Sequence, residues 1–202
     1  MNTTDNGIVF IIDDDDGFRE SVQWLLQSED LQTVGFSSAR TFLDEYQNEI
    51  GCILLDIRMP DINGLTALQL MQEQKINIPI IMISGHGDIP IAVSAMKHGA
   101  TDFIEKPFDD DALLRLVHQA LNKAAQLAEE SSSLMMLQEN YAQLSRREKQ
   151  VMEQVVAGLA NREIAEKLGI SPKTVEVHRS RVMSKMAAES LPDLVKKATQ
   201  LL

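Results

Sequence analysis

Ile8-Val-Phe-Ile-Ile12 is a short apolar run that leads directly into four carboxylates, Asp13 to Asp16. A second run, Cys52-Ile-Leu-Leu55, leads in the same way into Asp56. Runs this short and this rich in Val, Ile and Leu are typical of parallel strands that are buried on both faces. Ligands of open α/β sheets bind beyond the carboxyl ends of such strands. The sequence therefore predicts that Asp13, Asp14 and Asp56 meet at one edge of a parallel sheet.

Strand and helix patterns alternate through the first part of the chain, which predicts a doubly wound α/β domain with right-handed crossovers. The expected strands are 8–12, 31–36, 51–55, 78–83 and 101–104. The expected helices are 17–28, 38–47, 64–73, 89–98 and 109–127. Ser38 and Asp109 are candidate helix caps, and Gly99 is a candidate helix stop. This pattern corresponds to a flavodoxin-like fold with a five-stranded parallel sheet.

Composition limits the class of protein. The chain has 202 residues, 44% of them hydrophobic, which is enough for one or two ordinary cores. No apolar stretch is long enough to span a membrane, and the first residues do not resemble a signal peptide. The single cysteine, Cys52, lies in an expected core strand and excludes a disulfide framework. We therefore expect a cytoplasmic protein with no membrane partner.

The charge is divided unevenly along the chain. The total is −11, but residues 1–140 carry −15 and residues 141–202 carry +4. Such asymmetry predicts two domains with different partners, the second able to meet phosphates. We place the first domain at 6–123 and the second at 141–202, with a helical linker at 124–140 between them. Whether that linker rests on a neighbouring surface, mediates dimerisation or acts as a flexible tether stays open.

The sequence of the second domain predicts short helices separated by turns. Ser145 stands three residues before Glu148, which is the spacing of a capping box. Asn161 is expected to cap the next helix, and Ser171 with Pro172 to begin a third helix that runs to about Met186. A final helix starts near residue 191. Two helices joined by a tight turn containing Gly, the second helix basic, predict a small all-α helix-turn-helix domain.

The first domain carries the residues that phosphoryl transfer requires. Such transfer needs a nucleophile, a metal that neutralises phosphoryl oxygens and a cation on the phosphate. Asp56 stands directly after its strand and is the expected nucleophile, while Ser84 and Lys106 end later strands and contribute a hydroxyl and a cation. One Mg²⁺ is expected on Asp13, Asp14, Asp56 and the backbone carbonyl of Arg58. The bond between Lys106 and Pro107 is a candidate cis peptide.

Residues 6–123 resemble the receiver domain of bacterial two-component response regulators. The segment Asp56-Ile-Arg-Met-Pro-Asp-Ile-Asn-Gly64 resembles the phosphoacceptor motif of that family. Two further segments resemble the FixJ branch of this family in particular, namely Ser84-Gly-His-Gly-Asp-Ile-Pro90 and Ala100-Thr-Asp-Phe-Ile-Glu-Lys-Pro-Phe108. The resemblance implies that Asp56 accepts a phosphoryl group from a sensor histidine kinase. It also implies that Ser84 and Phe103 form a switch and that the phosphorylated protein is a homodimer. Ser84 stands where this branch usually has Thr, but the hydroxyl is kept.

The third helix of the second domain has the pattern of a DNA-reading helix. Val175, Val182 and Met186 lie on one stripe suited to burial, and the N-terminal part of the opposite face would lie nearest the bases. Thr174 and Val177 suit thymine methyl groups. The full set of expected DNA contacts is Lys173, Thr174, Val177, His178, Ser180, Arg181 and Lys185, with Arg162 and Arg179 as further phosphate contacts. For His178 a packed or phosphate-facing role is favoured over base reading.

The segments Leu144-Ser-Arg-Arg-Glu148 and Ile164-Ala-Glu-Lys-Leu-Gly-Ile-Ser-Pro-Lys-Thr-Val-Glu-Val-His-Arg179 resemble LuxR-type DNA-binding domains. With the receiver resemblance, they imply a transcriptional regulator that binds double-stranded promoter DNA when phosphorylated and acts with RNA polymerase, more as an activator than as a repressor. No enzyme beyond the receiver's own phosphorylation and dephosphorylation is expected.

Two other classes of protein share part of this pattern. Aspartyl-phosphate phosphatases of the dehalogenase type carry a second acid two residues after the nucleophile, where this chain has Arg58. A DNA-binding protein with an inactive receiver is disfavoured because Asp13, Asp14, Asp56, Ser84 and Lys106 are all present.

Overall fold

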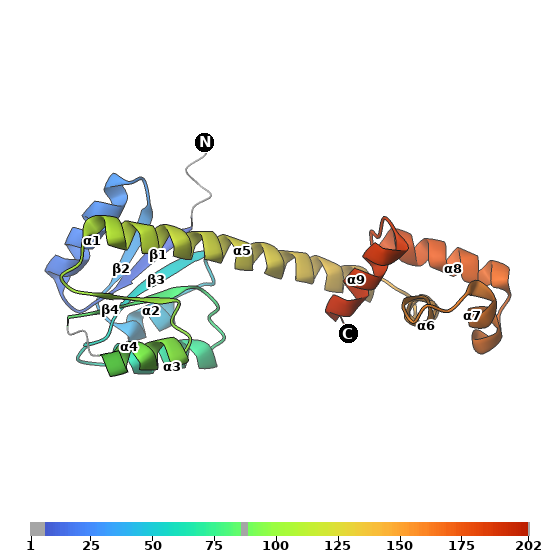
Figure 1. Cartoon of the computed structure of the whole chain (residues 1–202), viewed down its shortest axis with the longest axis horizontal. Helices are drawn as coiled ribbons and strands as arrows, with labels where there is room; N and C mark the ends of the chain where they lie inside the picture. Colours follow the sequence, from blue (N-terminus) through green and yellow to red (C-terminus); the bar gives the residue numbers. More distant parts are fainter. Residues whose placement is uncertain (1–6, 86–88, 202) are drawn as a thin grey trace. The chain divides into compact units, whose positions relative to one another are not determined.

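A five-stranded parallel sheet of order β2-β1-β3-β4-β5 organises the first of two units in the chain. The computed structural model describes residues 7–85 and 89–201, and the two units divide between Glu129 and Glu130 (Figure 1). The strands are β1 Ile8–Ile12, β2 Gln32–Phe36, β3 Gly51–Asp56, β4 Ile80–Ser84 and β5 Asp102–Glu105. The predicted doubly wound fold of the first domain is therefore confirmed, with β1 and β3 paired at the point where the strand order reverses.

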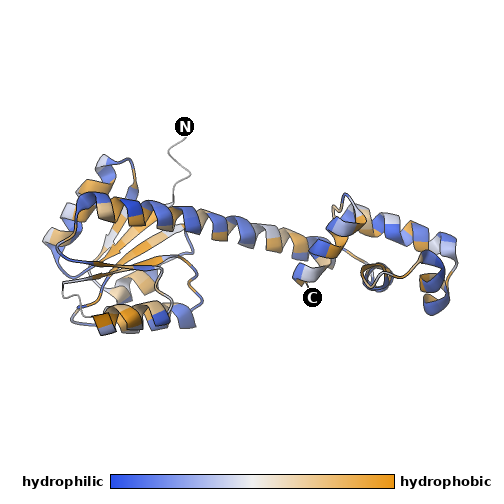
Figure 2. Cartoon of the chain, in the orientation of Figure 1, coloured by the Kyte–Doolittle hydropathy of each residue, from blue (hydrophilic) through white to orange (hydrophobic). Residues whose placement is uncertain are grey.

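Helices cover both faces of the sheet. They are α1 Asp16–Ser28, α2 Ala39–Glu45, α3 Gly64–Glu73, α4 Ile89–Lys97 and α5 Asp110–Ala142. One face is covered by α1 and α5, through residues such as Leu26 and Val117, and the other by α2, α3 and α4, through residues such as Phe42 and Leu68. This sandwich explains why the central strands β1, β3 and β4 are almost entirely apolar (Figure 2).

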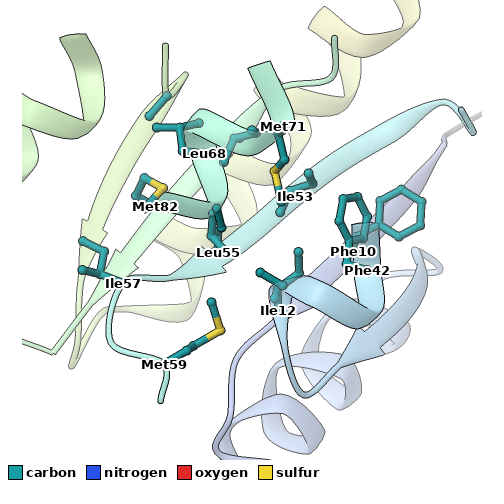
Figure 3. Packing of buried hydrophobic residues seen from close by; sticks show 14 of the residues in the cluster. Phe10, Ile12, Phe42, Ile53, Leu55, Ile57, Met59, Leu68, Met71 and Met82 are labelled. Carbon is teal, nitrogen blue, oxygen red and sulfur yellow. The ribbon is translucent and has the colours of Figure 1, made fainter. Parts of the chain in front are cut away.

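The core under α2 and α3 is shown in Figure 3, where Phe10, Phe42, Ile53 and Leu68 converge from strands and helices. The rings of Phe10 and Phe42 meet edge to face with their centroids 5.4 Å apart. Full burial of each such side chain contributes about 1.5–3 kcal/mol to folding. This packing fixes the strands that carry the acidic edge.

Some element boundaries differ from the sequence prediction for identifiable reasons. Strand β4 begins at Ile80 rather than at residue 78, because Pro79 has no N–H for the ladder, although its carbonyl accepts from Ile53 at 2.9 Å. The predicted helix 109–127 does not stop there, because it continues as α5 through the expected linker to Ala142. Ser38 caps α2 as predicted, and the Lys106–Pro107 bond is cis as predicted.

The second unit consists of the last part of α5 and four further helices. These are α6 Arg146–Val156, α7 Asn161–Leu168, α8 Pro172–Lys185 and α9 Leu191–Leu201. Val151, Ile164 and Leu194 are at most 1% exposed and form part of one shared core. In the described parts of the chain, no helix combines the length and the apolar content needed to cross a membrane.

The helix starts of the second unit follow the predicted signals with one correction. Ser145 and Glu148 form the capping box, and Ser171 caps α8 with Pro172 as its first residue. The expected cap Asn161 is wrong, since Ala160 holds the N-cap position and makes no side-chain cap. The carboxylate of Glu163 instead accepts from the N–H of Ala160 at 2.7 Å, which satisfies one of the open donors at this helix start. Gly169 ends α7 in the left-handed conformation.

Candidate functional site

Three charged side chains from three strand ends meet at the carboxyl edge of the sheet. Asp13 follows β1, Asp56 ends β3, and Lys106 follows β5. The Nζ of Lys106 lies 2.6 Å from Oδ2 of Asp13 and 2.9 Å from Oδ1 of Asp56. Because these residues gather beside the β1–β3 pair, they occupy the crevice where sheets of this order bind their ligands.

Each of the two carboxylates is held by a backbone N–H as well as by Lys106. The N–H of Asp15 donates to Oδ1 of Asp13 at 2.9 Å, and the N–H of Arg58 donates to Oδ2 of Asp56 at 2.6 Å. The side chains of Asp13 and Asp56 are only 3% and 8% exposed. Buried carboxylates are costly unless paired, so the cation and these N–H donors together make the arrangement stable.

The protonation of this cluster follows from its burial and its charges. Burial raises the pKa of Asp13 above its ordinary value, although the hydrogen bond from Lys106 acts in the opposite direction. Burial alone would lower the pKa of Lys106, but the hydrogen bonds and charges of Asp13 and Asp56 together raise it. Lys106 is therefore a cation at neutral pH, available to an anionic group bound at this edge.

Ser84 and Phe103 lie on the two strands next to the acidic pair. Ser84 ends β4, is 1% exposed, and its carbonyl accepts from the N–H of Lys106 at 2.7 Å. Phe103 is partly buried on β5 and packs against the core under α2 and α3. The strand register therefore brings the hydroxyl-bearing residue and the lysine to one place. His86, Gly87 and Asp88, part of the segment that resembles the FixJ branch, lie outside the described residues.

Asp14 does not join the other two carboxylates. Its side chain is exposed, and the residues that the structure describes include no group of three His, Cys, Asp or Glu able to hold a metal ion. Lys106 bridges Asp13 and Asp56 instead. The donor set nevertheless fits Mg²⁺, because two buried carboxylates are hard oxygen ligands and are oriented by the N–H groups of Asp15 and Arg58.

An aromatic side chain that the sequence analysis did not single out completes the edge. The ring of Phe18 lies with its centroid 3.6 Å from the Nζ of Lys106. Phe18 also lines an open groove of about 580 Å³ on α1, together with Trp24, Leu25 and Phe108. The sequence contained a signal for this position of Phe18. Asp15 caps α1 by accepting from the N–H of Phe18, so the first helical turn brings Phe18 back beside the acidic loop.

In the second unit, α8 separates a buried stripe from an exposed face. Val175, Val182 and Met186 are at most 1% exposed, as their spacing predicted. The opposite face is solvent-exposed and carries Lys173, Thr174, Val177, Ser180 and Arg181. The exposed face mixes cations, hydroxyls and one apolar side chain, which are the groups that contact phosphates and base edges in a major groove.

Some of the expected DNA contacts have partners within this unit. The Nζ of Lys185 lies 2.7 Å from Oε2 of the buried Glu148, and Arg179 donates to Oδ1 of Asn161 at 2.8 Å. His178 is partly buried, and its Nδ1 has no hydrogen-bond partner within the described chain. The Nε of Arg162 lies 3.6 Å from Oε1 of Glu166, and the two side chains are 87% and 74% exposed. Because this pair is exposed, Arg162 is accessible to a phosphate, whereas Lys185 is paired with a buried carboxylate.

Two family models cover most of the chain. Residues 9–118 match the response regulator receiver domain, and residues 142–198 match the bacterial regulatory proteins of the luxR family. The chain is 47% identical to the transcriptional regulatory protein FixJ of Azorhizobium caulinodans over 94% of this chain and 90% of that protein. It is 43% identical to the response regulator protein TodT of Pseudomonas putida over 96% of this chain and 86% of that protein.

Solved structures give the same result. The response regulator StyR superposes with a TM-score of 0.86 at 38% identity, covering 96% of this chain and 98% of that one. Full-length FixJ from B. japonicum gives a TM-score of 0.59 at 42% identity, covering 98% of each chain.

Proposed function

The chain belongs to the response regulators that join a receiver domain to a LuxR-type DNA-binding domain, as FixJ does, and we propose that Asp56 is its phosphoryl acceptor. Proteins of this family are not classical enzymes but DNA-binding transcriptional regulators that phosphorylation switches. The observation that carries the assignment of Asp56 is its position at the end of β3, sharing the ammonium of Lys106 with Asp13.

Asp56 takes the phosphoryl group from the phosphohistidine of a sensor histidine kinase. A carboxylate oxygen of Asp56 forms the new bond to phosphorus while the bond from phosphorus to the histidine nitrogen breaks. Lys106 then offers its ammonium to a phosphoryl oxygen, and Ser84 offers its hydroxyl to another. The buried, oriented state of Asp56 supports this role because a positioned nucleophile loses little entropy on reaction. The receiver thereby catalyses its own phosphorylation and dephosphorylation.

We propose that Asp13, Asp56 and the backbone carbonyl of Arg58 would hold one Mg²⁺ per receiver domain, and that Asp14 would join them by turning its exposed side chain toward the edge. When bound, the ion neutralises charge on the phosphoryl oxygens. The N–H of Asp15 keeps the carboxylate of Asp13 turned toward the edge. The ammonium of Lys106 bridges the two buried carboxylates and is displaced from one of them on activation.

Phosphorylation is proposed to produce a homodimer through the face formed by α4, β5 and the first part of α5, with Ser84 and Phe103 as the switch. One stripe of α4 supports this, because Ile89, Val93 and Met96 are 77%, 46% and 48% exposed. Their spacing of four and three residues places them on the same helix face. Exposed apolar side chains gathered on one face are typical of a surface that a partner covers.

The proposed DNA contacts are Lys173, Thr174, Val177, Ser180 and Arg181. Arg162 is proposed to contact a phosphate, and His178 to lie at the edge of the contact surface rather than to read a base. Lys185 is left out because its charge is paired with the buried carboxylate of Glu148, whereas Lys173 is kept because its pair with Glu176 is exposed. We divide the chain into a receiver domain at 6–123, a linker at 124–140 and a DNA-binding domain at 141–202, whose last residue, Leu202, lies outside the described part. The proposed setting is the cytoplasm, where the protein meets the kinase, promoter DNA and RNA polymerase.

Sedimentation of the full chain with Mg²⁺ and beryllofluoride, which mimics a phosphoryl group on Asp56, tests the acceptor and the dimer together. We expect the mass to double, the affinity for a promoter fragment to rise, and both effects to disappear in Asp56→Asn. Asp61→Asn is the matched control, since Asp61 is a neighbouring carboxylate that is 51% exposed and paired only with surface Arg40. Circular dichroism shows whether both variants are folded.

An Asp56→Asn variant that dimerises and binds DNA like the wild type would reject Asp56 as the switch. That result would favour a DNA-binding protein that works independently of phosphorylation. A change in DNA affinity without a change in mass would keep the acceptor but reject dimerisation as the route of activation.

A further inference from the structure

The ammonium of Lys106 has a third close neighbour besides the two carboxylates. The face of the Phe18 ring lies 3.6 Å from Nζ, measured to the ring centroid. At that distance the negative face of an aromatic ring attracts a cation. Lys106 is 24% exposed and carries a flexible four-carbon stem, so the carboxylates alone do not exclude other positions for its ammonium.

Phe18 is itself fixed from two directions. Its N–H donates to Oδ1 of Asp15 at 3.1 Å, which ties it to the first turn of α1. Its ring packs edge to face on Phe108, with the centroids 6.0 Å apart and the planes at 80°. Phe108 follows Lys106 by two residues, so the same loop carries the cation and the ring that supports Phe18. The aromatic face is therefore held in place beside the flexible stem of Lys106.

We propose that Phe18 is a positioning residue for Lys106 in phosphoryl transfer, an inference that rests on the function proposed above. The ring holds the ammonium at the carboxyl edge, where it must stand when a phosphoryl group arrives on Asp56. Catalysis of phosphoryl transfer depends on charges that are in place before the reaction begins. A ring that restricts Lys106 therefore increases the rate without touching the phosphoryl group.

A leucine at this position separates the electrostatic role of the ring from its bulk. Leu keeps an apolar side chain that can fill the same space, but it has no aromatic face to attract the ammonium. Tyr keeps the aromatic face. Trp24→Leu is the matched control, because Trp24 lies on the same helix and in the same groove but is 74% exposed.

The test uses the full chain with acetyl phosphate as the phosphodonor at saturating Mg²⁺. The measured quantity is the rate at which Asp56 is phosphorylated. We expect Phe18→Leu to slow labelling about three- to tenfold, as expected for the loss of a partly exposed cation–π contact. Phe18→Tyr and Trp24→Leu should react at the wild-type rate. Calorimetric titration with Mg²⁺ should show that Phe18→Leu binds the ion no more weakly than the wild type, because the ring contacts Lys106 and not the carboxylates.

Three results would overturn the inference while leaving the proposed function intact. They are an unaffected Phe18→Leu, a Phe18→Tyr as slow as Phe18→Leu, and a loss of Mg²⁺ affinity that accompanies the loss of rate. The third result would indicate that the substitution disturbs the whole carboxyl edge, including Asp13 and Asp56, rather than Lys106 alone. A wild-type chain that takes up no phosphoryl group on Asp56 would instead reject the proposed function, and this inference with it.

Discussion

The carboxylate of Glu148 accepts hydrogen bonds both at the start of α6 and from the last residue of α8. It accepts from the N–H of Ser145 at 2.8 Å, which completes the capping box of α6, and from the Nζ of Lys185 on α8 at 2.7 Å. The Glu148 side chain is 3% exposed, whereas that of Lys185 is 36% exposed. The pair therefore joins α6 and α8 through two residues that lie 37 positions apart in the sequence.

Replacing Glu148 with Gln should destabilise the DNA-binding unit. The substitution leaves the ammonium of Lys185 without its anionic partner and weakens the cap, and such losses cost about 2–4 kcal/mol in the free energy of unfolding. Urea unfolding, followed through amide NMR signals of residues 146–198, measures the loss. Glu153→Gln, an exposed position on the same helix, should change the free energy by less than about 0.5 kcal/mol. Equal losses in the two variants would contradict the special role of the pair.

The same pair should make the second unit sensitive to acid. The hydrogen bond from Lys185 lowers the pKa of Glu148 from 4.5 to about 2. A carboxylate whose pKa is lowered by folding stabilises the fold above its unfolded pKa and loses that contribution as the pH falls. We expect this contribution to be lost progressively as the pH falls from about 4.5 to about 2. The difference in unfolding free energy between wild type and Glu148→Gln should shrink over this interval, and a constant difference would refute the linkage.

Ala160→Ser should stabilise the same unit. Ala160 holds the N-cap position of α7 with extended backbone angles, but it has no side-chain oxygen to accept from the first turn. A serine there should add about 0.5–2 kcal/mol. Thermal unfolding gives the measurement, and Ala157→Ser, at the end of α6, is the control that should not stabilise. A lower melting temperature for Ala160→Ser would mean that the new hydroxyl displaces the bond from Ala160 to Glu163.

Two residues of the proposed DNA-binding surface should affect DNA affinity in different ways when they are replaced. Arg162→Gln should weaken binding to all sequences and reduce the salt dependence of the affinity by about one phosphate contact. Thr174→Ala should cost about 1–3 kcal/mol on the preferred site alone, because a lost base contact relaxes specificity. Titrations of specific and unrelated DNA at several salt concentrations separate the two effects. Lys196→Gln, an exposed cation on α9, should leave both unchanged.

Val93→Glu should prevent beryllofluoride-induced dimerisation. A charge in the middle of the exposed α4 stripe cannot be buried against a second copy without a large desolvation cost. Sedimentation should show a monomer, while the labelling of Asp56 by acetyl phosphate continues. A variant that dimerises normally would exclude α4 from the interface.

The acidic edge was predictable from sequence because the strand ends determine it. Asp13 and Asp56 stand at or directly after an apolar run, Lys106 directly follows the last strand, and parallel strands bring their carboxyl ends to one side. The bridging position of Lys106 was not predictable, since a four-carbon stem can reach several partners from one strand end. Nor did the pattern reveal the pairing of Lys185 with Glu148, which depends on how α6 and α8 pack.

One local error has a simple physical origin. The cap of α7 was misplaced by one residue, because Asn is a better cap than Ala in isolation, yet Glu163 satisfies the N–H of Ala160 from within the helix. The expected helical linker at 124–140 lies within the continuous α5, since residues 110–142 contain neither Gly nor Pro. Its polar Ser131-Ser-Ser133 run weakens helix propensity but does not break a helix.

Trp24 gives the protein an optical reporter of its own. It is the only tryptophan in the chain, and its indole stands 74% exposed at the groove that Phe18 and Phe108 also line. Indole emission shifts in wavelength and intensity when water around the ring is replaced. A molecule that enters this groove can therefore be followed by intrinsic fluorescence in the unmodified protein, without a dye and without a second emitting tryptophan to subtract.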